Sequence, residues 1–379
     1  MLVSTPGKAT GAANSAVSGP SLGTGVIHNV QALRALAALL VVFVHIDKLL
    51  AVVGMRPFGY GGVDIFFVIS GFIMVHTTMH RDVTPWSFLA NRIARIAPIY
   101  WTITIVVFIT ALAAPTLLQA TKANWTELFK SLAFIPFRKS NGLIQPVLFV
   151  GWTLNYEMFF YALFAVGLSA RDKKFGAAAV ILGLVCLVAW GLVEQPEGVI
   201  ASFYTASIML EFALGMLICL THRRISSHAS TPLKIAAVVL LLAGVSGAVL
   251  LPLGLPKAPS LLVSGLPATL VLGCAVALER WGWAVTTPCW LLFGNASYSI
   301  YLTHPFVTQI VQKIVGHMEL NALVAVALIA VTLASVCVVG VMAHYILERP
   351  LSNALRRLVA ARRSPAFVPM KMRFRQTGI

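Results

Sequence analysis

Apolar stretches about 20 residues long recur along this chain, and they constrain its fold more than any other feature. A helix needs about 20 mainly apolar residues to cross the hydrocarbon core of a bilayer. The stretches are continuously apolar and do not alternate with period two, which favours helices over a barrel. Hydrophobic residues make up 59% of the 379 and charged residues 11%, which excludes an ordinary soluble domain. The sequence therefore predicts an all-α, polytopic integral membrane helical bundle of about ten transmembrane helices. The predicted spans lie in the windows 30–50, 61–80, 97–118, 147–168, 175–193, 201–220, 233–251, 259–279, 288–309 and 319–345.

Basic residues indicate how these helices are oriented. An even number of spans places both termini on one side of the membrane. If that side is the cytoplasm, 19 of the 28 Lys and Arg residues fall on it, as the positive-inside rule requires. The predicted topology is therefore N-in and C-in. The loop 119–146 would hold four basic residues on the outside, which argues weakly against this orientation.

The chain divides into three predicted segments. Residues 1–27 are rich in Ser, Gly, Ala and Thr without an apolar core, which is typical of a disordered cytoplasmic leader rather than a signal peptide. Residues 28–348 form the transmembrane domain. Residues 349–379 form a basic cytoplasmic tail, expected to lie on the inner membrane surface because Leu351 and Leu355 share one helical face with arginines around it.

The net charge of +16 does not indicate a nucleic-acid-binding protein. The charges are dispersed through short loops and the tail rather than gathered with aromatic residues on one surface. We expect them to contact anionic membrane lipids instead. The five cysteines show no CxxC spacing and predict neither a metal site nor a disulfide framework.

Ionisable side chains inside the apolar spans are the candidates for function. A charge at the centre of a bilayer costs roughly 2.5–3.5 kcal/mol on insertion scales, so such residues face protein or water and mark functional sites by default. For a membrane histidine, the alternative is a packed, hydrogen-bonded structural group. The candidates are Arg34, His45, Asp64, Glu157, Glu211, His304 and His344.

Arg34 and His45 are predicted to share one face of the first span. Eleven residues at about 100° each bring the helix about 20° past three full turns. The same spacing separates the two residues by about 16 Å along the helix axis. Arg34 would then lie near the cytoplasmic mouth and His45 in the outer half of the membrane. Asp47 would point roughly 160° away from His45 on a continuing helix, which makes it a poor partner.

Other spans bring further polar groups toward the depth of His45. Asp64 lies in the first turn of the second span, where a carboxylate can orient the His45 imidazole and raise its basicity. The ninth span brings His304 to a similar depth. Glu157 falls nearer the bilayer centre, and Ser70 can hydrogen-bond to a neighbouring helix.

Arg92 and Arg95 lie at positions i and i+3 of the segment NRIARIAPIYW, so they are neighbours on a helical surface at the cytoplasmic boundary. Guanidinium forks match phosphate oxygens better than the point charge of a lysine does. The pair is therefore a candidate phosphate site. From spacing alone, ordinary positive-inside arginines are the competing explanation.

Five segments, spread over about residues 28–350, carry a family resemblance. They are RALAALLVVFVH, GGVDIFFVISGFI, NRIARIAPIY, GWTLNYEMFFYALF and ASYSIYLTHPF. In this order they resemble the acyltransferase-3 family of integral membrane O-acyltransferases, especially the rhizobial type that acetylates exopolysaccharide or lipo-oligosaccharide. The resemblance implies a ten-helix acyltransferase domain in the bacterial cytoplasmic (inner) membrane. It also implies transfer of an acyl group, usually acetyl, from cytoplasmic acyl-CoA to a hydroxyl of a surface polysaccharide or lipid-linked sugar.

The resemblance also assigns roles to residues of this chain. The family's Arg-x10-His pattern maps onto Arg34 and His45, with His45 required for activity, and its Arg-x-x-Arg pattern maps onto Arg92 and Arg95. In the combined hypothesis acetyl-CoA is the co-substrate and no metal takes part. His45 acts either as a general base on the acceptor hydroxyl or through an acyl-histidine intermediate. The expected site comprises the catalytic residues His45, Asp64 and Glu157, the acyl-CoA-binding residues Arg34, Arg92 and Arg95, and the acceptor or supporting residues Ser70, Tyr298 and His304.

Two other classes of protein compete with this hypothesis. Buried His, Asp, Glu and Arg arranged by depth also describe a proton-coupled transporter. The spans show no inverted duplication and no paired broken helices, which argues against a transporter. A non-catalytic partner in polysaccharide export is the third possibility.

Overall fold

The computed structural model describes residues 26–114 and 123–361, and the chain there is helical. Within these ranges the only β-type pairing is an isolated bridge between Arg138 and Ile144. The predicted all-α class is confirmed. Residues 1–25, most of the predicted leader, and 362–379, most of the predicted tail, lie outside the described residues.

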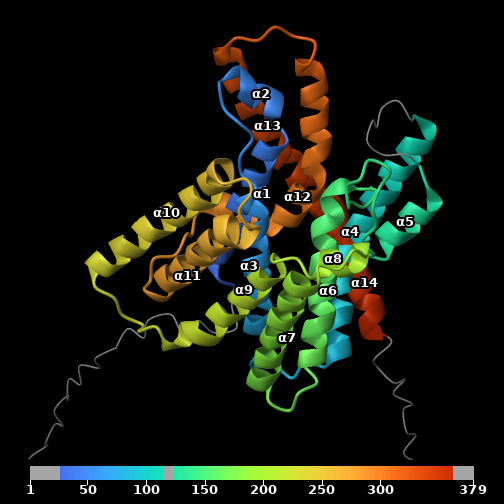
Figure 1. The fold of residues 1–379 in the computed structure, drawn as a ribbon. Helices are drawn as coiled ribbons and strands as arrows, with labels where there is room; N and C mark the ends of the chain where they lie inside the picture. Colours follow the sequence, from blue (N-terminus) through green and yellow to red (C-terminus); the bar gives the residue numbers. More distant parts are fainter. Residues whose placement is uncertain (1–25, 115–122, 362–379) are drawn as a thin grey trace, which may run out of the picture.

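The helices, drawn in Figure 1, are α1 (His28–Val44), α2 (Asp47–Val52), α3 (Gly61–Thr78), α4 (Pro85–Ala113), α5 (Trp125–Leu132), α6 (Trp152–Gly167), α7 (Lys173–Glu194), α8 (Val199–Tyr204), α9 (Met209–Thr221), α10 (Thr231–Gly254), α11 (Leu266–Arg280), α12 (Pro288–Val315), α13 (Ala322–Ala343) and α14 (Arg349–Ala361), with 3-10 turns η1 (Phe149–Gly151) and η2 (His222–Arg224) and π-helical turns η3 (Leu261–Gly265) and η4 (His344–Glu348).

Each of the ten predicted windows contains a helix. Seven helical segments among the described residues are long and apolar enough to cross a membrane, and α1, with 17 residues, is a shorter apolar helix. The chain is therefore a polytopic membrane protein. The count of ten spans and the N-in, C-in orientation stay predictions.

Several helices begin at residues whose side chains accept the free backbone N–H groups of a first turn. The Thr84 hydroxyl accepts from the N–H of Ser87 ahead of Pro85, where α4 starts. Asp172 and Asn321 cap α7 and α13 in the same way. These polar caps define the residues at which the three apolar helices begin.

Helix α3 lies at the centre of the bundle, and glycines let its neighbours approach it closely. Its membrane-spanning window is 72% buried, against 17% for α10. A Cβ on Gly71 would lie 2.0 Å from the carbonyl oxygen of Phe212 on α9, and one on Gly215 would lie 1.9 Å from that of Val68. Backbones in such contact have no room for a larger residue.

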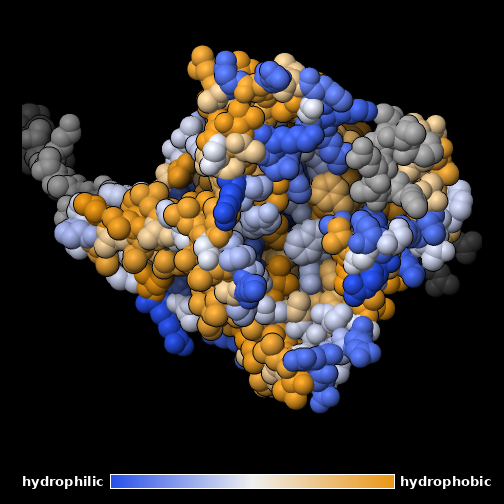
Figure 2. Space-filling model, turned by 45° about the horizontal axis from the view of Figure 1, so that its top comes forward, coloured by the Kyte–Doolittle hydropathy of each residue, from blue (hydrophilic) through white to orange (hydrophobic). Residues whose placement is uncertain are grey.

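The peripheral helices present apolar side chains outward. Helices α7, α10 and α13 carry exposed leucines and valines such as Leu192, Leu242 and Val331, as expected where lipid replaces protein. Figure 2 turns the α2 end of the molecule toward the viewer. Hydrophobic side chains cover its left side, where α10 and α11 lie, and the face is hollowed near its centre, with hydrophilic side chains along much of the rim.

The chain does not leave the bundle at residue 348, where the predicted transmembrane domain ends. Helix α13 continues through the π-helical turn η4 into α14, which packs beside α4 (Figure 1). The Ser352 hydroxyl donates to the carbonyl oxygen of Arg95 at 3.4 Å. Helix α14 therefore lies beside α4, while Leu358 on its apolar side stays exposed. The placement of the basic tail on the inner membrane surface stays a prediction.

Candidate active site

A cavity of about 310 Å³ runs beside α1 into the bundle. At one end it is lined by Val26 and Ile27 at the start of α1 and by Thr77 at the end of α3. At the other it reaches Phe66 near the start of α3 and Tyr301 on α12. Under the predicted topology, the first end faces the cytoplasm and the second lies in the outer half of the membrane.

The three predicted acyl-CoA-binding arginines all line this cavity, although they come from two helices. Arg34 projects from α1, and Arg92 and Arg95 from α4. Arg34 lies within electrostatic range of Arg95, and their repulsion is offset by Glu157 and Glu348 nearby. Three arginines that converge on one cavity wall suit a polyanionic ligand.

Arg92 is less fully hydrogen-bonded than Arg34. Its guanidinium lies over the ring of Phe88, 5.5 Å from the ring centroid. Its Nε is buried and has no hydrogen-bond partner among the described residues. By contrast, Arg34 donates from Nη1 to Gln31 at 3.3 Å. A buried guanidinium N–H without an acceptor is costly, so the cavity offers Arg92 a place where a ligand oxygen would complete its bonding.

Glu157 lies midway along the cavity and gathers hydroxyl groups around it. The Ser70 hydroxyl donates to Glu157 Oε1 at 3.2 Å, and the Tyr161 hydroxyl donates to the same oxygen in a short contact. All three residues line the cavity. The structure thus brings Glu157 and Ser70 together as parts of one network. It adds Tyr161, which the sequence analysis missed. The spacing could have indicated it, because Tyr161 follows Glu157 by one helical turn.

Tyr298, predicted as a supporting residue, also lines the cavity. Its hydroxyl donates to the carbonyl oxygen of Ile96 at 2.8 Å. Ile96 lies in α4 next to Arg95, so this bond ties α12 to the arginine-bearing helix. Tyr298 therefore shapes the wall beside the arginines.

His45 lies at the end of α1, where its own backbone N–H bonds to the carbonyl oxygen of Val42. Its half-buried ring stacks on that of His304, with 5.2 Å between centroids and 30° between planes. The edge of Phe149 packs against it at 5.3 Å. The predicted proximity of His45 and His304 is present in the structure, and neither residue is among those that line the cavity.

His304 is fully buried, and its hydrogen bond determines its tautomer. Its Nδ1 lies 2.7 Å from the carbonyl oxygen of Tyr301, which can only accept, so Nδ1 carries the proton. Its Nε2 has no partner among the described residues. Nε2 is therefore the ring nitrogen that stays available for proton exchange in this pair.

Asp64 does not lie where the sequence analysis placed it. Gly62 faces α1, since a Cβ there would lie 2.6 Å from the carbonyl oxygen of Ala37, and Asp64 points about 200° away from Gly62. Its carboxyl group is buried and lies close to that of Glu211 on α9. The expected role of Asp64 in orienting His45 is therefore corrected, because Asp64 faces Glu211 and not His45.

Asp47 is closer to His45 than the helical wheel predicted. Helix α1 ends at Val44 and α2 starts at Asp47, so the 100° rotation does not continue between them. Asp47 interacts electrostatically with His45. Gln312 of α12 joins the two by donating from Nε2 to the His45 carbonyl oxygen at 3.2 Å and, in a short contact, to Asp47 Oδ1.

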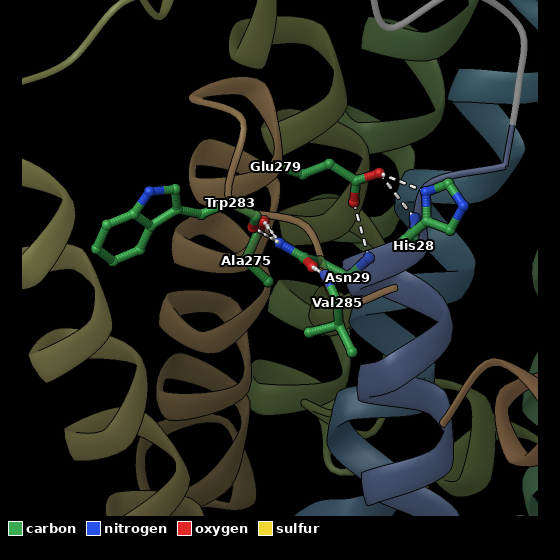
Figure 3. A network of polar contacts seen from close by, with 6 residues as sticks. All are labelled: His28, Asn29, Ala275, Glu279, Trp283 and Val285. Carbon is green, nitrogen blue, oxygen red and sulfur yellow. Dashed lines mark hydrogen bonds and ion pairs between the residues drawn. The ribbon is translucent and has the colours of Figure 1, made fainter. Parts of the chain in front are cut away.

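A buried network holds the start of α1, and the sequence analysis did not find it (Figure 3). Glu279 on α11 accepts from the backbone N–H groups of His28 at 2.8 Å and Asn29 at 2.7 Å. The Asn29 side chain donates to the carbonyl oxygens of Ala275 and Trp283, both at 2.9 Å, and accepts from the N–H of Val285. Glu279 thereby satisfies donors that every helix start leaves free. Because α1 carries both Arg34 and His45, this network sets their depth.

Metal ligands do not gather in the part of the chain that the structure describes: no group of three or more His, Cys, Asp or Glu there could hold a metal ion. The five cysteines are free thiols. The site is therefore built from arginines, hydroxyl groups, one carboxylate and two imidazoles. Such a set suits the binding of a phosphorylated donor and general acid–base chemistry.

Comparison with known proteins decides between the possible classes. A family model described as an acyltransferase domain matches residues 27–343. This chain belongs to the acyltransferase-3 family. That membership makes the protein a membrane acyltransferase, and the transporter and non-catalytic alternatives lose their support. The family matches the one that the sequence motifs resemble, so the resemblance is confirmed.

Curated relatives of this acyltransferase cover most of its length. The exopolysaccharide production protein ExoZ of Rhizobium meliloti (strain 1021) is 38% identical over 299 residues, covering 77% of this chain and 89% of ExoZ. BcsY of Komagataeibacter xylinus, which bears the name of a membrane-bound transacylase, is 25% identical and covers 88% of this chain and 85% of its own. The acyltransferase MdmB of Streptomyces mycarofaciens is 25% identical, with 83% and 87% covered. No solved structure matches the chain.

Proposed function

We propose that this acyltransferase moves an acyl group, acetyl in the simplest case, from acyl-CoA on the cytoplasmic side to a hydroxyl of an exopolysaccharide or its lipid-linked precursor. The membrane would be the bacterial cytoplasmic membrane. One observation carries the proposal: a cavity with Arg34, Arg92 and Arg95 along its wall leads toward the stacked imidazoles of His45 and His304. The relationship to ExoZ, a protein named for exopolysaccharide production, supports the choice of acceptor.

The arginines would hold the donor. The phosphate groups of CoA would lie against Arg92 and Arg95, with Arg34 deeper along α1, and bidentate bonds would fix their orientation. The spacing of Arg34 and His45 corresponds to about 16 Å along α1, a distance that an extended pantetheine arm would have to bridge. Phosphate binding and chemistry are thereby assigned to different depths of the membrane.

His45 would supply the base. In direct transfer, an acceptor oxygen bonds to the thioester carbon while His45 takes the hydroxyl proton. The C–S bond then breaks, and the CoA sulfur receives the proton from His45. The free Nε2 of His304 and its stacked ring would favour a cationic His45 in the transition state. In the second route, His45 itself takes the acyl group before the sugar does, and both routes use the same residues.

Glu157 would position groups rather than react. Its carboxylate orients the hydroxyls of Ser70 and Tyr161 around the middle of the cavity. Oriented hydroxyls can hold the amide groups of a pantetheine arm. We therefore assign Glu157 a positioning role within the donor cavity in place of the expected catalytic role.

Binding and transfer can be tested separately. Purified protein in lipid nanodiscs should gain thermal stability with CoA or acetyl-CoA, since a ligand that binds only the folded state raises the melting temperature. NMR of the surface glycan from cells with and without the gene should show an O-acyl signal only when the gene is present. No stabilisation by CoA, together with an unchanged glycan spectrum, would reject the proposed function. Labelled acetyl groups retained on the protein without acceptor would select the acyl-histidine route.

A further inference from the structure

Tyr301 borders both the proposed donor cavity and the imidazole pair. It belongs to the cavity wall, and its ring centroid lies 5.8 Å from that of His304. His304 in turn stacks on His45. A series of ring contacts therefore leads from the cavity to His45, and of these three rings only that of Tyr301 lines the cavity.

The Tyr301 ring is held in place by its hydroxyl group. The hydroxyl donates to the carbonyl oxygen of Val150 at 2.9 Å and lies 3.0 Å from the hydroxyl oxygen of Thr153. The edge-on contact with Phe66, at 5.9 Å, supports the same ring. Tyr301 is buried, so these bonds have no competition from water. Only a side chain with both an aromatic face and a polar tip can form such a wall.

This position creates a conflict with the chemistry. An acyl-CoA whose phosphates lie against the arginines would extend its thioester toward Tyr301. The thioester carbon cannot contact His45 while the tyrosine ring lies between them. Transfer therefore requires that the ring leave Val150 and Thr153.

We propose that Tyr301 is a positioning residue that keeps the bound thioester away from His45 until the acceptor is in place. The inference rests on the proposed function. The wall would suppress a side reaction in which water replaces the sugar: the water oxygen bonds to the acyl carbon, the C–S bond breaks, and the water proton passes through His45 to the CoA sulfur. A closed site protects a reactive acyl donor from this hydrolysis.

The test measures CoA release from acetyl-CoA without acceptor, using the purified protein in nanodiscs. Tyr301→Phe keeps the ring but loses both hydroxyl contacts, and Thr153→Val removes one partner with little change of shape. We expect the rate of CoA release without acceptor to rise roughly tenfold in Tyr301→Phe. The loss of two neutral hydrogen bonds should increase, by about that factor, the fraction of molecules in which the Tyr301 ring has moved away. Thr153→Val should show a smaller rise.

Tyr100→Phe is the matched control. Tyr100 is also buried, and its hydroxyl donates to a backbone carbonyl oxygen, that of Ser131 at 3.2 Å, but it does not line the cavity. Its release rate should equal that of the wild type. A Tyr301→Phe protein that is stabilised by CoA like the wild type, yet releases no more CoA without acceptor, would overturn the inference alone. A wild-type protein that CoA does not stabilise, with an unchanged glycan spectrum, would overturn the proposed function and the inference with it.

Discussion

The rings of His45 and His304 stack at 5.2 Å although 259 residues separate them in the chain. The pair joins the end of α1 to the middle of α12, and each residue has a different environment. His45 is half-buried and lies at a helix end, whereas His304 is fully buried with its Nδ1 held by Tyr301. Their chemistry can therefore be tested residue by residue.

Replacing His45 by Ala should abolish transfer without affecting donor binding. Loss of a general base costs typically 10²–10⁴-fold in rate, and His45 does not line the donor cavity. O-acylation of surface glycan should fall below detection, while the stabilisation by CoA persists. Glycan acylation at the wild-type level, with normal protein abundance, would show that His45 is not the base.

His304→Asn should reduce transfer less than His45→Ala does. An asparagine can still donate to the Tyr301 carbonyl oxygen, but it removes the stacked ring and the free Nε2 beside His45. We expect a rate loss of roughly 10-fold, in line with about 1.4 kcal/mol of supporting interaction. The measurement is the initial rate of transfer at saturating acetyl-CoA. An unchanged rate would leave His304 as a packing residue.

Arg92→Gln and Arg95→Gln should weaken CoA binding. A hydrogen bond to a charged group is worth about 1.5–3 kcal/mol, so each change should raise the dissociation constant roughly 10- to 100-fold. Isothermal titration with CoA measures this directly. The matched control is Arg171→Gln, which alters an exposed loop arginine outside the cavity. Equal weakening by all three variants would indicate a general charge effect instead of a phosphate site.

Glu279→Gln should destabilise the start of α1. The carboxylate accepts from two backbone N–H groups, whereas a glutamine would turn an NH₂ group toward one of those donors. The expected loss is about 1–3 kcal/mol, the cost of a buried unsatisfied donor. It would appear as a lower melting temperature and as earlier proteolysis near His28. If the variant melts like the wild type, the network in Figure 3 does not hold α1 in place.

Gly71→Ala should be poorly tolerated, whereas Gly183→Ala should be neutral. A Cβ on Gly71 would lie 2.0 Å from the Phe212 carbonyl oxygen, but a Cβ on Gly183 has open space around it. Forcing α3 and α9 apart should cost about 1–3 kcal/mol or more. Thermal melting of both variants in the same detergent provides the comparison. Equal melting temperatures would mean that the two helices can separate freely.

The sequence alone determined the class of fold and the family to which the chain belongs. A bilayer demands runs of fixed length whose backbone bonds are internal, so apolar windows found the helices without knowledge of their neighbours. Helical spacing within one span likewise predicted that Arg92 and Arg95 are neighbours on one helical surface. These properties depend on local sequence, which is why they could be predicted.

Only the tertiary structure decided which residues meet. The depth of Asp64 along its helix did not reveal that it faces Glu211 instead of His45, and the rotation from His45 to Asp47 failed because α1 ends at Val44. The positions of Tyr301 and Glu279 depend on how α12 and α11 pack against α1. A helix sequence defines an apolar or polar face, but the direction in which that face points is set by contacts with helices hundreds of residues away.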